Sequence, residues 1–256
     1  MNNSPIGVFD SGMGGLSVWR ELRRGLPEES LLYYGDGLHC PYGEKPARQV
    51  LGYIDAAVRE LLDRDAKLIV LACNTATMTA VKYLRSRYAV PFVGMEPAIK
   101  PAVESTESGV VGVLATHMSL CSEWFAELRD RYSADVEVVS AAGDGFVEIV
   151  EAGEEDSPQA GEVVRRAVRP LMDAGADRIV LGCTHYPFLA HRIAEAVGDG
   201  KVEIIDPAPA IARRVEFLLD EYGIRAERGH AAEYGFLSAA GEEYARRLQG
   251  KAGTLL

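Results

Sequence analysis

Residues 68–77 read LIVLACNTAT, and residues 178–187 read RIVLGCTHYP. In each stretch a short apolar run rich in Ile, Val and Leu ends in a small residue, a cysteine and then side chains with hydroxyl or amide groups. Such a run is typical of a buried strand in a parallel sheet, and each cysteine falls where its strand would end. Cys73 and Cys183 are 110 residues apart and hold equivalent places. We predict two similar lobes whose cysteines face each other across one cleft.

The surrounding sequence repeats at a similar distance. VVGVLAT at 110–116 mirrors IGVFDSG at 6–12, and VEIID precedes PAPAI as VPFVG precedes MEPAI, so that matched elements lie 105 to 112 residues apart at four places. Strands alternate with helices, which indicates parallel sheets with right-handed crossovers. The expected strands cover 6–9, 30–36, 68–72, 90–94, 110–116, 136–142, 178–182 and 202–206, and the expected helices cover 16–25, 46–64, 74–87, 119–131, 158–174, a segment from 187, 211–222 and 240–249.

The expected fold class is therefore α/β, with two pseudo-symmetric lobes that are each a mostly parallel sheet flanked by helices. Residues 1–97 together with 208–256 are expected to form the first lobe with its C-terminal helices, and residues 98–207 the second. Ligands of such sheets bind outside the carboxyl ends of the strands, where the polar motifs of both lobes lie. An active site in the cleft between the lobes is the prediction.

Composition excludes several classes of protein. The 256 residues are 48% hydrophobic and carry a net charge of −11, which argues against binding to nucleic acid or to an anionic membrane. No apolar run approaches the roughly 18–20 residues of a membrane span, and the N-terminus lacks the pattern of a signal peptide. Four cysteines in a chain of this length do not suggest a secreted disulfide framework. We expect a cytoplasmic protein with reduced thiols.

The two strand-end cysteines are candidates for acid/base chemistry. Each precedes an expected helix, whose positive N-terminal end favours a thiolate, and each is followed by hydrogen-bonding side chains. The alternative is that a strand-end cysteine is only a small buried hydrophobic residue. Two cysteines in register with polar followers favour the chemical interpretation for Cys73 and Cys183. Cys40 and Cys121 lack this setting, and a structural role is expected for them.

Three further side chains could assist these thiols, and each has a plain structural alternative. Asp10, beside Ser11, could orient a thiol or cap the following helix. Glu151 could act at the site or be a solvated helix charge, and His185 could donate a proton or be structural. The turn DSGMGG lacks the Lys and the spacing of a nucleotide-binding loop. Cys183, His185 and His191 match no zinc pattern, so no metal is expected.

Five motifs carry a family resemblance: FDSGMGG at 9–15, YYGDGLHCPYGEK at 33–45, ACNTAT at 72–77, FVEIVE at 146–151 and LGCTHYP at 181–187. Together they resemble the glutamate racemases, cofactor-independent enzymes that supply D-glutamate for peptidoglycan, over about residues 5–240. The resemblance implies that Cys73 and Cys183 are the catalytic acid/base pair, with Asp10 and Glu151 near the first and His185 near the second. It implies substrate contacts from Asp10, Ser11, Pro41, Tyr42, Gly43, Asn74, Thr75, Thr116, Ser119, Thr184 and His185.

Two segments depart from the family pattern. Residues 37–40 read GLHC where relatives more often carry a Thr-Ala-Arg-like run. Residues 113–122 replace a more Gly/Thr-rich segment and leave Thr116 and Ser119 where two threonines are commoner. In the family these positions lie near the distal end of the substrate, so they bear on fine specificity. Glutamate is the expected partner and no cofactor is expected; a homodimer is also expected.

The chemistry explains why two thiols are needed. Inverting an α-carbon requires removing a proton from one face and delivering one to the other, with one group ionised and one protonated. By resemblance, Cys73 takes the proton of the D-enantiomer and Cys183 that of the L-enantiomer. The alternatives are a racemase of another amino acid such as aspartate, a thiol–disulfide protein, which the absence of C-x-x-C disfavours, and a non-catalytic amino-acid-binding regulator.

Overall fold

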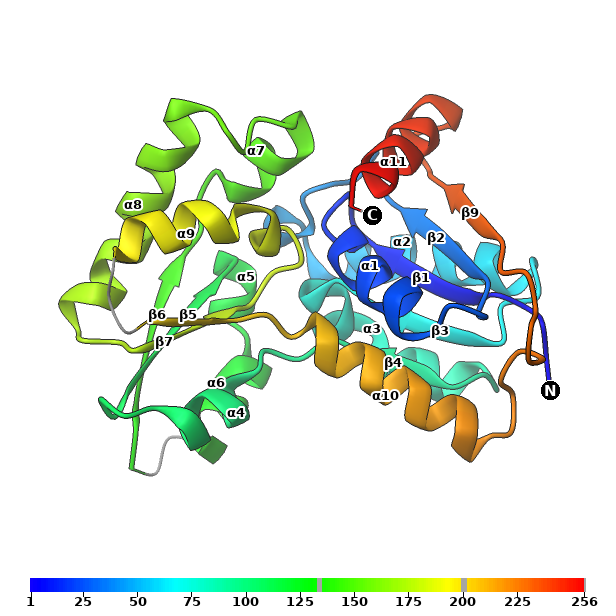
Figure 1. Ribbon diagram of the computed structural model, residues 1–256, viewed down its shortest axis with the longest axis horizontal. Helices are drawn as coiled ribbons and strands as arrows, with labels where there is room; N and C mark the ends of the chain where they lie inside the picture. The colour runs from blue at the N-terminus through cyan, green and yellow to red at the C-terminus, as the bar shows by residue number, and fades with distance from the viewer. Residues whose placement is uncertain (133–134, 199–201, 256) are drawn as a thin grey trace. The chain divides into compact units, whose positions relative to one another are not determined.

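The computed structural model describes residues 1–132, 135–198 and 202–255. The chain divides into two compact units, Met1–Met95 with Ala208–Leu256, and Glu96–Pro207. Each unit is a parallel sheet covered by helices on both faces (Figure 1), which confirms the predicted α/β class. No helix among the described residues has the length and apolar character needed to cross a membrane.

The first unit holds a five-stranded parallel sheet in the order β4-β3-β1-β2-β9. β1, β2 and β3 are each followed by a helix that connects to another parallel strand of this sheet, as crossovers between parallel strands require. Its elements are β1 (Ile6–Asp10), α1 (Leu16–Gly25), β2 (Leu31–Gly35), the short 3-10 helix η1 (Tyr42–Glu44), α2 (Ala47–Leu62), β3 (Leu68–Leu71), α3 (Asn74–Arg87), β4 (Phe92–Gly94), α10 (Ala208–Glu221), β9 (Tyr234–Leu237) and α11 (Glu242–Thr254).

Alternate residues of these strands point to opposite faces of the sheet, and each face packs against its own layer of helices. Phe9, Ile69 and Leu71 are fully buried against α2 and α3, through Val50 and Ile54 among others. On the other face α1 packs against α10 and α11 (Figure 1). Strands buried on both faces read as continuous apolar runs, which is why LIVL gives no alternating pattern.

The second unit holds a four-stranded parallel sheet in the order β6-β5-β7-β8. One face packs on α8 and α9, and the other on α4 and α6. Its elements are α4 (Ile99–Ser105), β5 (Val110–Ala115), α5 (His117–Leu120), α6 (Glu123–Tyr132), β6 (Glu137–Ala142), α7 (Phe146–Ala152), α8 (Pro158–Asp173), β7 (Arg178–Leu181), the 3-10 helix η2 (Tyr186–Leu189), α9 (Ala190–Val197) and β8 (Glu203–Ile205).

The two sheets share one strand order, because β4-β3-β1-β2 in the first corresponds to β8-β7-β5-β6 in the second. Cys73 and Cys183 therefore follow equivalent strands, β3 and β7, as the repeated sequence predicted. The observed division falls after Met95 rather than after residue 97.

The structure differs from the sequence prediction at β9, at α4 and at the helix expected over 119–131. β9 was missed because it is a four-residue edge strand that contains a glycine and is only partly buried. It is positioned by Trp19 of α1, whose ring meets the ring of Tyr234 edge-on at 5.6 Å. The short helix α4 was also missed. The single helix expected over 119–131 is two helices, because Ser122 Oγ donates to Ser119 O and accepts from Phe125 N between them.

Candidate active site

The carboxyl ends of three neighbouring strands bring polar residues to one edge of the first sheet. Asp10 ends β1, Asp36 follows β2 and Cys73 follows β3 two residues after its end. The main chains are joined there, since Asp36 N donates to Asp10 O at 3.0 Å and Ala72 N donates to Phe9 O at 2.8 Å. Parallel pairing thus gathers residues that are far apart in the sequence.

Cys73 is the N-cap of α3. Its Sγ accepts a hydrogen bond from Ala76 N at 3.5 Å, and it lies 3.6 Å from Ser11 Oγ. Both the donated N–H and the positive end of a 14-residue helix stabilise negative charge on the sulfur. The predicted helix start at Cys73 is confirmed.

Asp10 has no exposed surface, and its Oδ1 accepts from Gly12 N at 2.9 Å. It does not cap α1, whose N-cap is Gly15 with no side-chain hydrogen bond. The chain passes very close to Asp10, because a Cβ on Gly15 would lie 2.5 Å from the Asp10 Cβ. The capping alternative is therefore wrong, and the glycine turn serves to enclose the carboxylate.

Asn74 and Thr75 are both buried, at 3% and 4% exposure. Neither the amide oxygen nor the amide nitrogen of Asn74 has a hydrogen-bond partner among the described residues. A buried amide without partners costs folding free energy, so such groups are rare unless a ligand satisfies them. The Asn74 amide, directly after Cys73, is placed to bind a ligand.

The loop after β2 carries Pro41, Tyr42 and Gly43. Tyr42 is buried, and its hydroxyl donates to Asp36 Oδ2 at 2.5 Å. Burial first, and then the negative charge of Asp36, raises the pKa of Tyr42 well above its usual range. The phenol therefore stays protonated, and the hydrogen bond to Asp36 anchors the loop.

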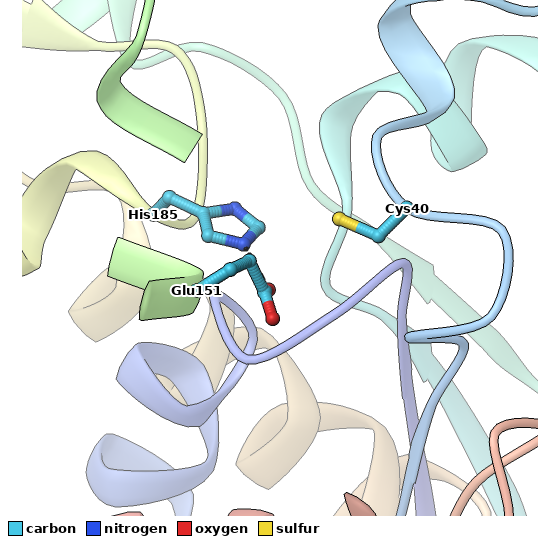
Figure 2. A group of neighbouring side chains, drawn as sticks. All are labelled: Cys40, Glu151 and His185. Carbon is cyan, nitrogen blue, oxygen red and sulfur yellow. Dashed lines mark hydrogen bonds and ion pairs between the residues drawn. The ribbon is translucent and has the colours of Figure 1, made fainter. Parts of the chain in front are cut away.

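In the second unit an imidazole lies between a carboxylate and a thiol. His185, with 2% of its side chain exposed, has its Nε2 2.7 Å from Glu151 Oε1 and its Nδ1 3.8 Å from Cys183 Sγ. Figure 2 shows the His185 ring and the Glu151 carboxyl group side by side. A carboxylate that accepts from Nε2 selects the tautomer with the proton on that nitrogen, so Nδ1 presents a lone pair toward the sulfur.

The Glu151 carboxylate pairs with His185 beside Cys183, which excludes the interpretation of Glu151 as a solvated helix charge. Its expected place near Cys73 stays a prediction, because the two residues belong to different units. One prediction about this group was wrong. Cys183 does not begin a helix directly, because a turn over Thr184 and His185 precedes η2. Only Cys73 caps a helix, so the two thiols have different surroundings.

Three residues that are predicted to contact the substrate lie in the second unit. Thr184 is 2% exposed, Thr116 caps α5 with its Oγ1 2.9 Å from Ser119 Oγ, and Ser119 is itself buried. Tyr186, which the sequence did not single out, is fully buried with its hydroxyl 3.4 Å from Gly143 O. Burial first, and then the charge of Cys183, raises the pKa of Tyr186 well above its usual range.

Within each unit, the described side chains do not bring three of His, Cys, Asp or Glu close enough to share a cation. Sequence reasoning places Asp36 at the end of its strand but assigns it no role. It missed Tyr186, which carries no local signal.

The fold and these thiol sites match one family. A family model described as Asp/Glu/Hydantoin racemase covers residues 17–215. The chain therefore belongs to the Asp/Glu/Hydantoin racemase family.

Within that family its similar relatives are glutamate racemases. The chain is 50% identical over 219 residues to the glutamate racemase of Herpetosiphon aurantiacus, with 86% of each chain covered. Escherichia coli glutamate racemase in complex with L-glutamate and the activator UDP-MurNAc-ala matches at a TM-score of 0.87 and 32% identity, covering 98% of this chain and 95% of that one. Francisella tularensis glutamate racemase with D-glutamate gives 0.83 and 28%, with 98% and 94% covered. The resemblance found in the five motifs is confirmed.

Proposed function

We propose that this chain interconverts L-glutamate and D-glutamate by a two-base proton transfer without a cofactor, and so supplies D-glutamate for peptidoglycan. One structural observation carries the proposal within the family assignment. Equivalent strands of two similar sheets each end in a cysteine, and each cysteine has its own acid/base surroundings.

Racemisation needs two groups because a base on one side of the α-carbon cannot reach the other side. In the proposed reaction one thiolate removes the α-proton while a thiol delivers a proton to the opposite face. The roles are reversed for the other enantiomer. Thiols suit both roles because their ordinary pKa lies near neutrality. We assign Cys73 to the proton of D-glutamate and Cys183 to that of L-glutamate.

On the Cys73 side, the thiolate is favoured by the helix N-terminus and by the Ala76 N–H. Ser11 Oγ, at 3.6 Å from the sulfur, can accept from the protonated thiol. We propose that the buried Asp10 holds the substrate ammonium or orients this thiol. Burial strengthens its electrostatic influence on nearby groups.

On the Cys183 side, His185 supplies the proton acceptor. With Nε2 held by Glu151, Nδ1 can accept the thiol proton and leave a thiolate beside an imidazolium. Glu151 then stabilises the positive charge that forms on the ring. The arrangement resembles an Asp–His pair acting on a nucleophile, with Glu151 orienting the imidazole.

The α-proton is weakly acidic, so the developing carbanion needs stabilisation. We propose that the substrate carboxylate takes hydrogen bonds from Asn74, Thr75 and Thr184, which are all buried. Fixed donors in a site that excludes water stabilise developing charge more than water does. The unsatisfied Asn74 amide supports this assignment.

The experiment is incubation of the purified chain in D₂O with L-glutamate or D-glutamate and no added cofactor. We expect the optical rotation to fall to zero from either side while deuterium enters the α-position. A non-catalytic amino-acid-binding protein would bind glutamate without either change. An aspartate racemase would act on L-aspartate instead, and this substrate is included as the comparison.

Two further assignments are proposed with this function. All four cysteines are free thiols, and the mechanism requires them to stay reduced, which supports a cytoplasmic location. The homodimer expected from the sequence is retained as a proposal. Light scattering during gel filtration, at several protein concentrations, distinguishes a dimer from a monomer.

A further inference from the structure

The loop between β2 and α2 contains the segment GLHC at 37–40. His39, in this segment, contacts residues of the two elements that flank the loop, Asp36 directly after β2 and Tyr53 on α2. Its Nδ1 lies 2.8 Å from Asp36 Oδ1, and its ring stacks on Tyr53 of α2 with centroids 3.6 Å apart and planes at 11°. The His39 side chain therefore has a defined set of contacts on both sides of the loop.

Asp36 is the centre of this arrangement. It is 2% exposed and receives two side-chain donors from the loop that follows it, His39 Nδ1 and the Tyr42 hydroxyl. Its backbone N–H is bound to Asp10 O, so the carboxylate is fixed to the strand end. One buried carboxylate thus ties two loop residues to the sheet.

The second attachment is to α2. Tyr53, on which the His39 ring stacks, has its hydroxyl held by Gln49 Nε2 at 2.6 Å. The rings of Tyr42 and Tyr53 are also neighbours, with centroids 6.3 Å apart. His39 is therefore the residue that joins the Asp36 carboxylate to the aromatic surface of the helix.

We propose that His39 is a positioning residue that fixes Pro41, Tyr42 and Gly43 in the conformation that binds substrate. The inference rests on the proposed function, which makes these three residues substrate contacts. His39 does not transfer the α-proton in this proposal. It lowers the KM for both enantiomers by removing alternative conformations of the loop before substrate binds.

Substitutions at position 39 separate its two contacts. His39→Ala removes both, His39→Phe keeps a flat ring on Tyr53 without a donor, and His39→Arg keeps a planar donor group that can stack. We expect His39→Ala to raise the KM for L- and D-glutamate about 10-fold, because a hydrogen bond to a charged group is lost. The KM of His39→Phe should lie between those of the parent and of His39→Ala. The KM of His39→Arg should stay within about 3-fold of that of the parent.

The control is Arg48→Ala in the first turn of α2, where the side chain is exposed. It should leave KM and kcat unchanged. The primary deuterium isotope effect on α-proton transfer should stay the same in all variants, because the chemistry at the thiols is untouched. Hydrogen exchange provides a readout without activity: amides of 37–45 should exchange faster in His39→Ala and His39→Phe, and not in Arg48→Ala.

An unchanged KM together with unchanged exchange of the loop in His39→Ala and His39→Phe would overturn the proposal. A fall in kcat with an altered isotope effect and a constant KM would overturn it also, since His39 would then act in the chemistry. If the parent chain fails to racemise glutamate, the proposed function fails. Hydrogen exchange would still decide whether His39 orders the loop.

Discussion

The Nε2 atom of His185 lies 2.7 Å from Glu151 Oε1, and the same ring points its Nδ1 toward Cys183 Sγ at 3.8 Å. Glu151 comes from α7 and His185 from the turn after β7, 34 residues further along the chain. A single imidazole therefore connects a carboxylate to the thiol. We expect Glu151 to influence the sulfur through the orientation and charge of that ring.

Replacement of Glu151 tests this relationship. Glu151→Gln keeps the size of the side chain but removes the charge that stabilises an imidazolium. We expect kcat to fall about 10- to 100-fold with a smaller change in KM, and more strongly for L-glutamate than for D-glutamate. Steady-state kinetics in both directions measure the effect.

Glu148→Gln on the same helix, where the side chain is exposed, is the matched control and should behave as the parent. In the double variant Glu151→Gln/His185→Asn the two losses of kcat should not add, because the two side chains act on Cys183 together. Additive losses would show that Glu151 acts independently of His185.

Each cysteine can be removed separately. Cys73→Ser and Cys183→Ser should each reduce racemisation by about 100-fold or more, because one of the two proton-transfer groups becomes a poor acid and a poor base. Nuclear magnetic resonance in D₂O follows α-deuteration of each enantiomer. Cys121→Ser, at an exposed position, is the control. Retention of full two-way activity by either site variant would exclude the two-thiol mechanism.

Asn74 should show opposite effects on stability and on binding. Asn74→Ala removes a buried amide that has no partner among the described residues, so the free energy of unfolding of the substrate-free protein should stay the same or rise by up to about 1 kcal/mol. The KM should rise about 10-fold, because a substrate hydrogen bond is lost. Urea unfolding and kinetics measure the two quantities.

Ser86→Ala, at an exposed position of the same helix, should change neither quantity. A clear loss of stability in Asn74→Ala with an unchanged KM would assign the amide a structural role.

Asp177 should make stability depend on acid pH. Burial by itself would raise the pKa of Asp177, but hydrogen bonds from Thr106, Glu107 and Ser108 outweigh it and lower the pKa to about 2. The unfolded chain has a higher pKa for this group, about 3.9, so the stabilisation is present above pH 4 and is lost as the pH falls toward 2.

Asp177→Asn should therefore lower the free energy of unfolding by about 1–2 kcal/mol at pH 7, a value reduced for partial exposure to water. The difference from the parent should shrink as the pH approaches 2. Urea unfolding over this pH range measures it, with the exposed Asp173→Asn on α8 as the control. A difference that stays constant with pH would contradict the role of the carboxylate charge.

Much of the site could be predicted because it depends on local pattern and on repetition. A buried parallel strand is a continuous apolar run, so LIVLAC and RIVLGC revealed both strands and the cysteines at their ends. Parallel pairing then required Asp10 and Cys73 to lie at one edge of their sheet, where they are found. Residue type and place in the chain were sufficient for these conclusions.

Tertiary structure alone decided which polar groups meet. The contact of Glu151 with His185, and of His39 with Asp36 and Tyr53, depends on side-chain direction and on packing between distant segments, which sequence spacing does not encode. The same holds for β9, a short edge strand whose place is set by Trp19 and β2. The sequence by itself determined two similar sheets, each ending one strand in a thiol. The helix cap at Cys73 and the place of His185 beside Cys183 are local features that the sequence predicted. The folded chain decided that Glu151, 34 residues away, holds that imidazole, because this contact is long-range.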